Sequence, residues 1–437
     1  MLATLSILAA SLAFSEGLPK QTLIQHTLDN GLRVVLAPDH SAPVFGIAVT
    51  YDVGSRNERP GRTGFAHLFE HMMFQGSENV GKGEHFIQVL NNGGGMNGTT
   101  NEDRTNYFET LPKNQLDLAL FLEADRMRAL NVNQANLDNQ RNAVQEERRL
   151  GIDNQPYGKS YLEIDNLSFD NFAYKHSVIG SMRDLDDAKL DDVRDFFKTY
   201  YAPNNAILTL AGDIDPADAL ARVKKVFGTI PRQPKPDAPF LGEEERIGER
   251  RSTVYDPLAR LPKLMISWQI PPGNTPENDA MQMLSQALDG GKSARFYQTL
   301  VKDKELATEE DLQPDFRIGP SLLYAMATPR PGVKPEDLEA AIYAILGDVA
   351  EKGVTEAELA KARRQLRRRT IDQRQTTLST AMQIGELTVR FGDAELFNSR
   401  FDKLMAVTAA RIQEAAKKFL QVHRRTVVLT LPKETKS

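Results

Sequence analysis

Three residues in one short segment, His67, Glu70 and His71, have types and spacing that could do chemistry. The segment is predicted to be helical. Residues four apart project from one face of a helix, so both imidazoles can bind the same tetrahedral metal ion. Glu70 shares that face, where a carboxylate can take a proton from a water molecule that zinc has acidified. The pattern therefore indicates a zinc site with a general base beside it.

A zinc ion held by two histidines needs a third protein ligand. Glu146 and Glu147 are adjacent candidates on a later predicted helix. The alternative interpretation is a surface helix that carries two ordinary histidines. In a chain with seven histidines, the pattern His-x-x-Glu-His should arise by chance in only about one sequence in a hundred. We therefore favour the metal site.

The sequence around the motif resembles the pitrilysin, insulin-degrading enzyme and mitochondrial processing peptidase family, whose inverted zinc motif corresponds here to His67-Leu-Phe-Glu-His71. The flanking residues are similar too: Gly64-Phe-Ala precedes the motif and Met73-Phe-Gln-Gly-Ser77 follows it. Further similar segments lie at residues 97–107, 143–148, 200–205 and 288–297. The resemblance thus covers nearly the whole chain after residue 20.

The resemblance implies a set of metal ligands. It assigns Glu147 as the third zinc ligand, with Glu146 beside it. Family members often carry a second acidic residue two helical turns before the third ligand. Gln140 stands there in this chain. This difference puts the tuning of the site in doubt, but it does not put metal binding in doubt. The second half of the sequence has no His-x-x-Glu-His, so one zinc ion per chain is expected.

The resemblance also implies residues that bind the substrate. In the family, the edge strand that corresponds to residues 97–107 pairs with the substrate backbone, which makes Asn97 and Gly98 candidates; a purely structural turn is the alternative. Relatives hold the substrate carbonyl with an Arg/Tyr pair in their half without zinc, for which Arg317 and Tyr324 are the candidates. For this pair we favour the alternative of an exposed arginine and a half-buried tyrosine.

The remaining five histidines have no partner at metal-ligand spacing in the sequence. We therefore assign them no metal and expect them at the surface. They are His26, His40, His85, His176 and His423.

The elements that must position these residues form two similar series. In the first, strands are predicted at residues 32–36, 44–51, 105–111 and 206–211, with helices at 61–74, 114–129, 135–150, 189–200 and 217–227. In the second, strands at 264–270, 322–326 and 426–431 accompany helices at 276–288, 335–351, 355–374 and 409–420. The repeated order indicates an internal duplication, and strands with helices beside them predict an α+β fold of two homologous halves.

A proline-rich segment separates the two series. Prolines at 231, 234, 236 and 239 are followed by charged residues without apolar periodicity, which is typical of an extended, semi-rigid linker. We therefore predict a zinc-bearing domain at residues 21–230, a linker at 231–251 and a second homologous domain at 252–437. A length of 437 residues agrees with more than one domain.

Composition excludes several classes of protein. The absence of cysteine excludes disulfides, thiolate zinc ligands and cysteine nucleophiles. A net charge of −5, from 54 basic and 59 acidic side chains interspersed along the chain, argues against a nucleic-acid partner. The apolar first 14 residues are too short for a membrane span. They predict a signal peptide within residues 1–20 and a periplasmic location, with a cytoplasmic location as the alternative.

These observations predict a zinc-dependent metalloendopeptidase with an activated water as nucleophile and Glu70 as general base. The resemblance implies peptides or unfolded polypeptides as substrates, enclosed between two clam-like halves. A chain of this length supplies half of such a chamber, so we expect a second homologous subunit, in a heterodimer or a homodimer. The alternatives are a non-catalytic core or assembly subunit, whose relatives typically show an eroded zinc motif, and a peptide-binding chaperone of the same fold.

Overall fold

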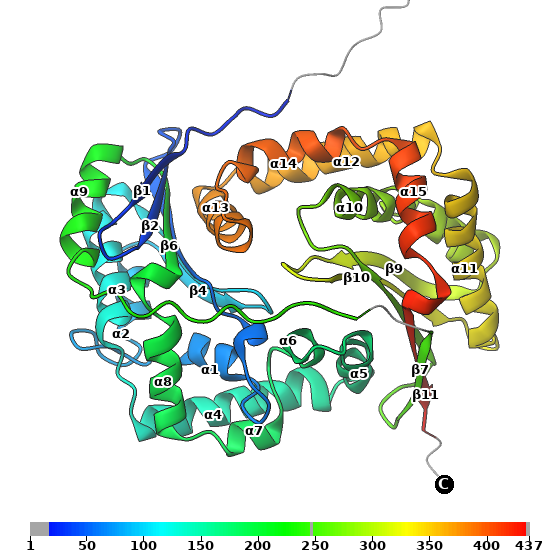
Figure 1. Ribbon diagram of the computed structural model, residues 1–437, viewed down its shortest axis with the longest axis horizontal. Coiled ribbons are helices and arrows are strands. Elements are labelled where there is room, and N and C mark those ends of the chain that lie inside the picture. The colour runs from blue at the N-terminus through cyan, green and yellow to red at the C-terminus, as the bar shows by residue number, and fades with distance from the viewer. Residues whose placement is uncertain (1–16, 245–247, 434–437) are drawn as a thin grey trace, which may run out of the picture.

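The computed structural model describes residues 17–244 and 248–433 of the chain. The signal peptide expected within residues 1–20 lies almost wholly outside the described residues. Two β-sheets with their helices lie side by side (Figure 1). Among the described residues, no helix combines the length and the apolar composition that crossing a bilayer requires.

The two sheets share one topology. The first has six strands in the order β1-β2-β6-β3-β5-β4, and the second has five in the order β7-β11-β8-β10-β9. Each contains one parallel pair, β2 with β6 and β7 with β11, and is otherwise antiparallel. If β1 is left aside, the strand orders correspond one to one. This confirms the predicted α+β fold of two similar halves.

The first sheet is built from β1 Ile24–Thr27, β2 Arg33–Pro38, β3 Val44–Tyr51, β4 Gly95–Thr100, β5 Thr105–Pro112 and β6 Ala206–Gly212. The second is built from β7 Arg250–Asp256, β8 Lys263–Ile270, β9 Ala307–Asp315, β10 Ser321–Pro329 and β11 Arg425–Pro432.

The α-helices of the first half are α1 Phe65–Met72, α2 Glu84–Asn91, α3 Leu116–Ala129, α4 Gln134–Arg148, α5 Gly158–Ser168, α6 Phe172–Lys175, α7 Met182–Asp186, α8 Leu190–Tyr200 and α9 Pro216–Phe227. Those of the second half are α10 Pro276–Leu288, α11 Pro335–Lys352, α12 Glu356–Gln373, α13 Thr377–Phe391, α14 Leu396–Met405 and α15 Ala409–Phe419.

Both faces of the first sheet are buried, each against different helices. Along β2, Val34 and Leu36 belong to a large core that also includes apolar residues of α1, α3, α4 and α9. Val35 and Ala37 point to the opposite face, where they pack with Ile384 and other residues of α13. The helix α13 comes from the second half of the sequence, yet it covers the first sheet (Figure 1).

Two glycines let α13 approach the sheet closely. A Cβ atom on Gly46 of β3 would lie 2.6 Å from the Cα of Leu378, and one on Gly385 of α13 would lie 2.6 Å from the Thr50 hydroxyl. Either side chain would force the helix away from the sheet, so both positions require glycine for packing.

A reciprocal exchange covers the second sheet. The helix α5, from the first half of the sequence, packs against β7, β8 and β11. Hydroxyl groups join it to the sheet, Ser160 to Thr430 at 2.5 Å and Ser168 to Ser267 at 2.6 Å. Each half thus lends one helix to the sheet of the other, and the two halves are held together by more than the segment between them.

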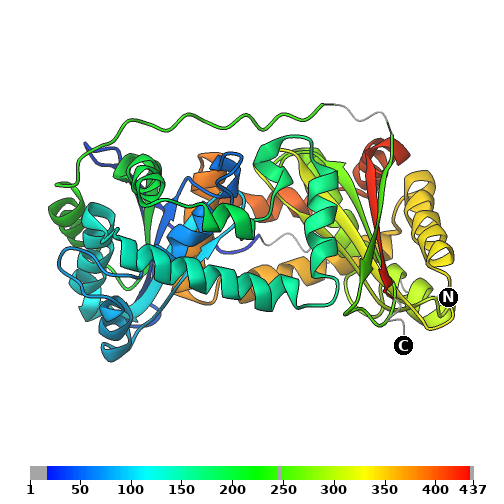
Figure 2. The same cartoon turned by 90° about the horizontal axis from the view of Figure 1, so that it is seen from below.

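That connecting segment is extended. Residues 231–244 form no helix or strand, and they run along one side of the molecule (Figure 2). Strand β7 begins at Arg250, inside the predicted linker range. The division into domains at 21–230 and 252–437 stays a prediction.

Candidate metal centre

The helix α1 presents the motif residues because its other side is apolar. Phe65, Leu68, Phe69 and Met72 are at most 2% exposed and belong to the core of the first half. The side chains of His67 and His71 lie on the opposite side and are 12% and 26% exposed. Amphipathic spacing therefore fixes the rotation of the helix and directs both imidazoles away from the core.

The helix α4 brings a carboxylate to these imidazoles. Glu147 Oε2 lies 3.3 Å from His71 Nε2 and 3.6 Å from His67 Nε2. Three ligand atoms about 2.0–2.1 Å from a tetrahedral zinc ion lie about 3.3–3.5 Å apart. One oxygen and two imidazole nitrogens are also a donor set that zinc prefers in catalytic sites. The residues present therefore fit a zinc ion.

The neighbouring carboxylate points elsewhere. Glu146 lies 3.1 Å from Arg149 and its side chain is 56% exposed. Gln140, two turns earlier on α4, is buried and donates to the side chain of Asn139. Of the two glutamates that the sequence offered as a third ligand, the structure brings Glu147 to the histidines.

The electrostatics of the site suit a metal ligand and a base. Burial, followed by the neighbouring His71, lowers the pKa of His67 to about 4, so this imidazole is neutral at neutral pH, as a ligand must be. Burial raises the pKa of Glu70, although a hydrogen bond from Thr100 and the nearby His71 oppose the shift. Thr100 and Arg104, which also acts on Glu70, were not identified from the sequence.

An edge strand passes directly over Glu70. Strand β4 pairs with β5 on one side only and forms the edge of the first sheet. A Cβ atom on Gly98 would lie 3.0 Å from Glu70 Cγ and 3.3 Å from the ring of Tyr107. Asn97 is exposed, and its side chain accepts a hydrogen bond from the Gly98 N–H. The structure therefore brings Gly98 next to the predicted base, and Asn97 precedes it on the same edge strand.

Arg317 and Tyr324 lie together but in a different environment. Arg317 is only 1% exposed, so the favoured interpretation of an exposed arginine is wrong. Its guanidinium lies 2.6 Å from Asp315 and 3.5 Å from Asp165, and the hydroxyl of Tyr324 donates to Asp165 as well. Because Asp165 belongs to the exchanged helix α5, these contacts join the two halves of the chain. A role in substrate binding stays a prediction.

A second group of potential metal ligands is buried beneath the site. His85, Glu109 and Glu123 are at most 4% exposed, and Arg126 donates to Glu123 at 3.0 Å through its Nε. Burial lowers the pKa of His85 to about 3 and raises that of Glu123 to about 7. Arg126 already supplies the positive charge that a metal ion would bring, so we interpret this group as structural. The expectation that His85 lies at the surface is wrong.

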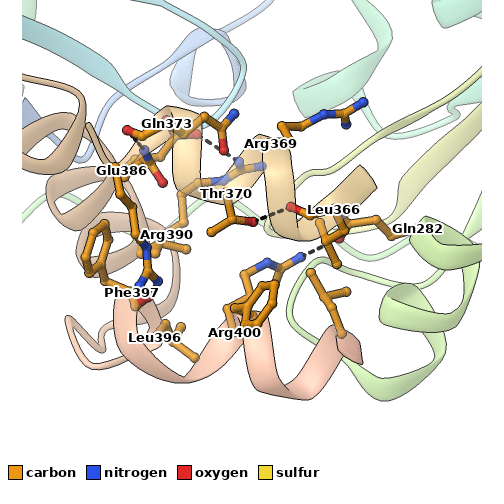
Figure 3. A pocket seen from close by; sticks show the side chains of 15 residues that line it. Gln282, Leu366, Arg369, Thr370, Gln373, Glu386, Arg390, Leu396, Phe397 and Arg400 are labelled. Atoms are coloured by element: carbon orange, nitrogen blue, oxygen red, sulfur yellow. Dashed lines mark hydrogen bonds and ion pairs between the residues drawn. The ribbon is translucent and has the colours of Figure 1, made fainter. Parts of the chain in front are cut away.

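The cavity drawn in Figure 3 is separate from the zinc motif. It has a volume of about 290 Å³ and lies between α12, α13 and α14. Arg390 and Arg400 line it, but Arg390 is paired with Glu386 at 3.0 Å and Arg400 donates to Gln282 at 3.2 Å. Because these guanidinium groups already have partners in the protein, we assign no ligand to this cavity.

The sequence matches family models and curated proteins over most of its length. Residues 33–163 match the family model described as Insulinase (Peptidase family M16), and residues 187–366 match the model of the Peptidase M16 inactive domain. The zinc protease PqqE of Helicobacter pylori is 32% identical over 357 residues, which cover 81% of this chain and 80% of that protein.

Solved structures show the same fold. A protease from Helicobacter pylori matches with a TM-score of 0.90 and 28% identity, covering 94% of this chain and all of that one. The periplasmic protease PqqL from Escherichia coli matches with a TM-score of 0.77 and 19% identity, covering 96% of this chain but 48% of that one. The matches to sequence and structure run through both halves. The chain therefore belongs to the insulinase family of peptidases, family M16.

Proposed function

We propose that this chain is a zinc-dependent peptidase in which His67, His71 and Glu147 hold the ion and Glu70 is the general base. The observation that carries the proposal is the spacing of 3.3 and 3.6 Å between Glu147 and the two imidazoles, with Glu70 on the same helix. Zinc in such a site would acidify a bound water molecule and polarise the scissile carbonyl. The names of the relatives, zinc proteases, support the same ion.

The residues of this chain would supply proton transfer and orientation. Glu70 would take the proton of the attacking water and return it to the leaving amine. A partly buried carboxylate with a raised pKa is a stronger base than one in water, which suits both transfers. The hydrogen bond from Thr100 would hold the Glu70 carboxylate in one orientation.

The open edge of β4 supports extended peptides as substrates. An edge strand has unpaired N–H and C=O groups along its free side, and a peptide in extended conformation can pair with them whatever its side chains are. Folded proteins expose few such segments, so oligopeptides and unfolded polypeptides are the proposed substrates. Asn97 and Gly98 would contact the peptide backbone next to the scissile bond.

A Gly98→Ala substitution should reduce kcat by about tenfold or more, because the new methyl group would meet Glu70 Cγ at 3.0 Å and displace the base. Gly95→Ala is the matched control: it lies on the same strand, and a Cβ atom there meets no atom within 4 Å. Steady-state cleavage of a fluorogenic peptide checks both variants. Equal kcat values for Gly98→Ala and the unaltered chain would contradict the proposed position of Glu70.

Removal of the metal tests the proposal as a whole. Dialysis of the purified chain against a zinc chelator should abolish cleavage of an unfolded polypeptide, and one equivalent of zinc should restore it. Cleavage that persists after zinc has been removed would refute a zinc peptidase. A chain that binds zinc and peptide without cleavage would instead support the alternative of a non-catalytic subunit or a chaperone.

A second subunit is the proposed partner. The PqqL chain is about twice as long as the part this chain matches, which supports the view that a chain of this length supplies one wall of an enclosing chamber. Enclosure excludes bulk water and aligns an extended substrate, and both effects lower the barrier to hydrolysis. We therefore expect the isolated monomer to be a poor enzyme.

The activity per chain should consequently rise with protein concentration if the partner is a second copy. It should stay low until a homologous subunit is added if the partner is distinct. Analytical ultracentrifugation alongside a peptide-cleavage assay separates the two cases. Full activity from a preparation shown to be monomeric would exclude both.

A periplasmic location is the proposed compartment. The apolar segment at the start of the chain and the periplasmic location stated for the PqqL structure support it. Fractionation of cells that produce the chain with a C-terminal tag would test it, and recovery only from the cytoplasm would contradict it.

A further inference from the structure

The N-terminal end of the zinc helix is held by a buried carboxylate. Glu58 Oε1 accepts a hydrogen bond from the Ala66 N–H at 2.8 Å, and Oε2 accepts one from the Gly64 N–H at 2.9 Å. N–H groups at the start of a helix lack partners within it, and a negative charge there is also favoured by the helix dipole. Ala66 immediately precedes His67, so Glu58 fixes the turn of α1 from which this proposed ligand projects.

A histidine closes the contact from the other side. His176 Nε2 lies 2.9 Å from Glu58 Oε2, and His176 Nδ1 lies 2.8 Å from the carbonyl oxygen of Phe172. A neutral imidazole carries one N–H, whereas a carbonyl and a carboxylate can only accept. With Glu58 ionised, both contacts are hydrogen bonds only if both ring nitrogens carry a proton, so the geometry points to an imidazolium. The expectation that His176 is a surface residue is wrong.

Burial makes this positive charge necessary. The Glu58 side chain is fully buried and that of His176 is 11% exposed. A buried carboxylate without a positive partner would be strongly destabilising. Burial acts to lower the pKa of His176, but the hydrogen bond to Glu58 and its charge raise that pKa above its ordinary value. Burial also raises the pKa of Glu58, while His176 opposes the shift.

Glu58 and His176 share one proton. A transfer of this proton from His176 to Glu58 would not change the number of protons that the pair binds. The two backbone N–H groups that donate to Glu58 oppose such a transfer, because they stabilise the ionised carboxylate. Tyr200 and Tyr201 also lie within range of Glu58, and burial raises their pKa values, so neither changes charge below about pH 10. Arg59 and Arg62, which line a common pocket with Glu58, are both paired with Asp192. Arg56, which lies nearby, is paired with Asp52 and Asp103.

We infer that Glu58 and His176 are positioning residues for the zinc helix: the protonated pair fixes the first turn of α1 and thereby the place of His67. The inference rests on the proposed zinc site. When the proton leaves, His176 loses one of its two hydrogen bonds and Glu58 loses its positive partner. The N-terminal turn of α1 then loosens, so zinc affinity should fall with rising pH through a group that does not touch the ion.

The first test measures the charge of the pair without reference to zinc. A histidine whose folded pKa is raised above its unfolded value of about 6.5 stabilises the fold fully below that pH, and the contribution is lost as pH rises through the folded pKa. The urea midpoint of the chain should therefore fall between pH 6 and pH 9 by more than that of His176→Gln. His40→Gln, which removes an exposed histidine paired with Asp213, is the control and should behave like the unaltered chain. An equal fall in the unaltered chain and in His176→Gln would overturn the inferred imidazolium.

The second test measures positioning. Substitution of a residue that orients a metal ligand typically lowers metal affinity by about 10–100-fold. In competition with a chromophoric zinc chelator, His176→Gln should bind zinc about tenfold more weakly at pH 6, and the difference should shrink towards pH 9. His176→Lys, which keeps a positive charge beside Glu58, should recover part of the affinity. A changed urea midpoint with unchanged zinc affinity would show a purely structural pair and overturn the positioning role.

The two tests separate this inference from the proposed function. If no variant binds zinc, and the unaltered chain does not either, the zinc peptidase fails while the urea midpoints still decide the charge of the pair. If the unaltered chain binds one zinc ion and His176→Gln binds it equally well at every pH, only the positioning role fails.

Discussion

A Glu70→Gln variant should keep its zinc and cleave peptides about 10²–10⁴-fold more slowly than the unaltered chain, which is the usual contribution of a general base. Glutamine has nearly the same shape as glutamate and can still meet Thr100, but its amide cannot accept a proton. Because Glu70 is not among the residues that converge on Glu147, the metal site itself should be unaffected. The loss should therefore fall on kcat and leave KM largely unchanged.

The measurement needs both zinc content and rate. Zinc analysis of the purified variant shows that the ligands are intact, and cleavage of a fluorogenic peptide gives kcat. Glu146→Gln is a suitable control, since it changes an exposed carboxylate that is paired with Arg149 rather than directed at the histidines. Wild-type cleavage by Glu70→Gln would show that the proposed mechanism is wrong.

Substitution of the proposed ligands should have the largest effect on metal content. His67→Ala, His71→Ala and Glu147→Gln each remove one of three converging ligand atoms. Each substitution should lower zinc affinity by more than the roughly 10–100-fold loss that is typical when a residue next to a ligand is replaced. Activity should be lost with the metal, since neither an acidified water nor a polarised carbonyl would then be available.

The comparison within α4 is the most discriminating. Glu146→Gln should retain one zinc ion per chain, while Glu147→Gln should not, because only the latter carboxylate lies within 3.6 Å of the imidazoles. Inductively coupled plasma analysis after gel filtration measures the stoichiometry. The opposite result, a required Glu146 and a dispensable Glu147, would place the third ligand one residue earlier on the helix.

The sequence alone determined the features that depend on short separations along the chain. His67, Glu70 and His71 could be interpreted together because a helix places residues four apart on one face, whatever the rest of the fold is. The helix α10 was predicted at its observed bounds, 276–288, and α4 within two residues of its ends, because their apolar residues recur with helical period. The order of strands and helices was sufficient to predict two similar halves.

The exchanged helices could not be predicted in this way. Both α5 and α13 were missed, and both contain several hydroxyl-bearing residues and a glycine where an ordinary amphipathic helix has large apolar side chains. They pack on sheet faces rich in alanine, threonine and serine, where small side chains permit close approach. Their helical state is decided by a surface far away in the sequence, and local propensity does not contain that information.

Tertiary structure alone also decided the surroundings of the site. Thr100 and Gly98 lie beside Glu70 because β4 pairs at the sheet edge over α1, a contact between segments about thirty residues apart. Arg317 is buried next to three carboxylates, of which Glu102 and Asp165 come from distant segments and Asp315 from its own. His176 meets Glu58 across more than one hundred residues. Spacing along the chain identifies the chemical groups that one helix can present. The groups that orient them and set their electrostatic environment come from segments that only folding brings together.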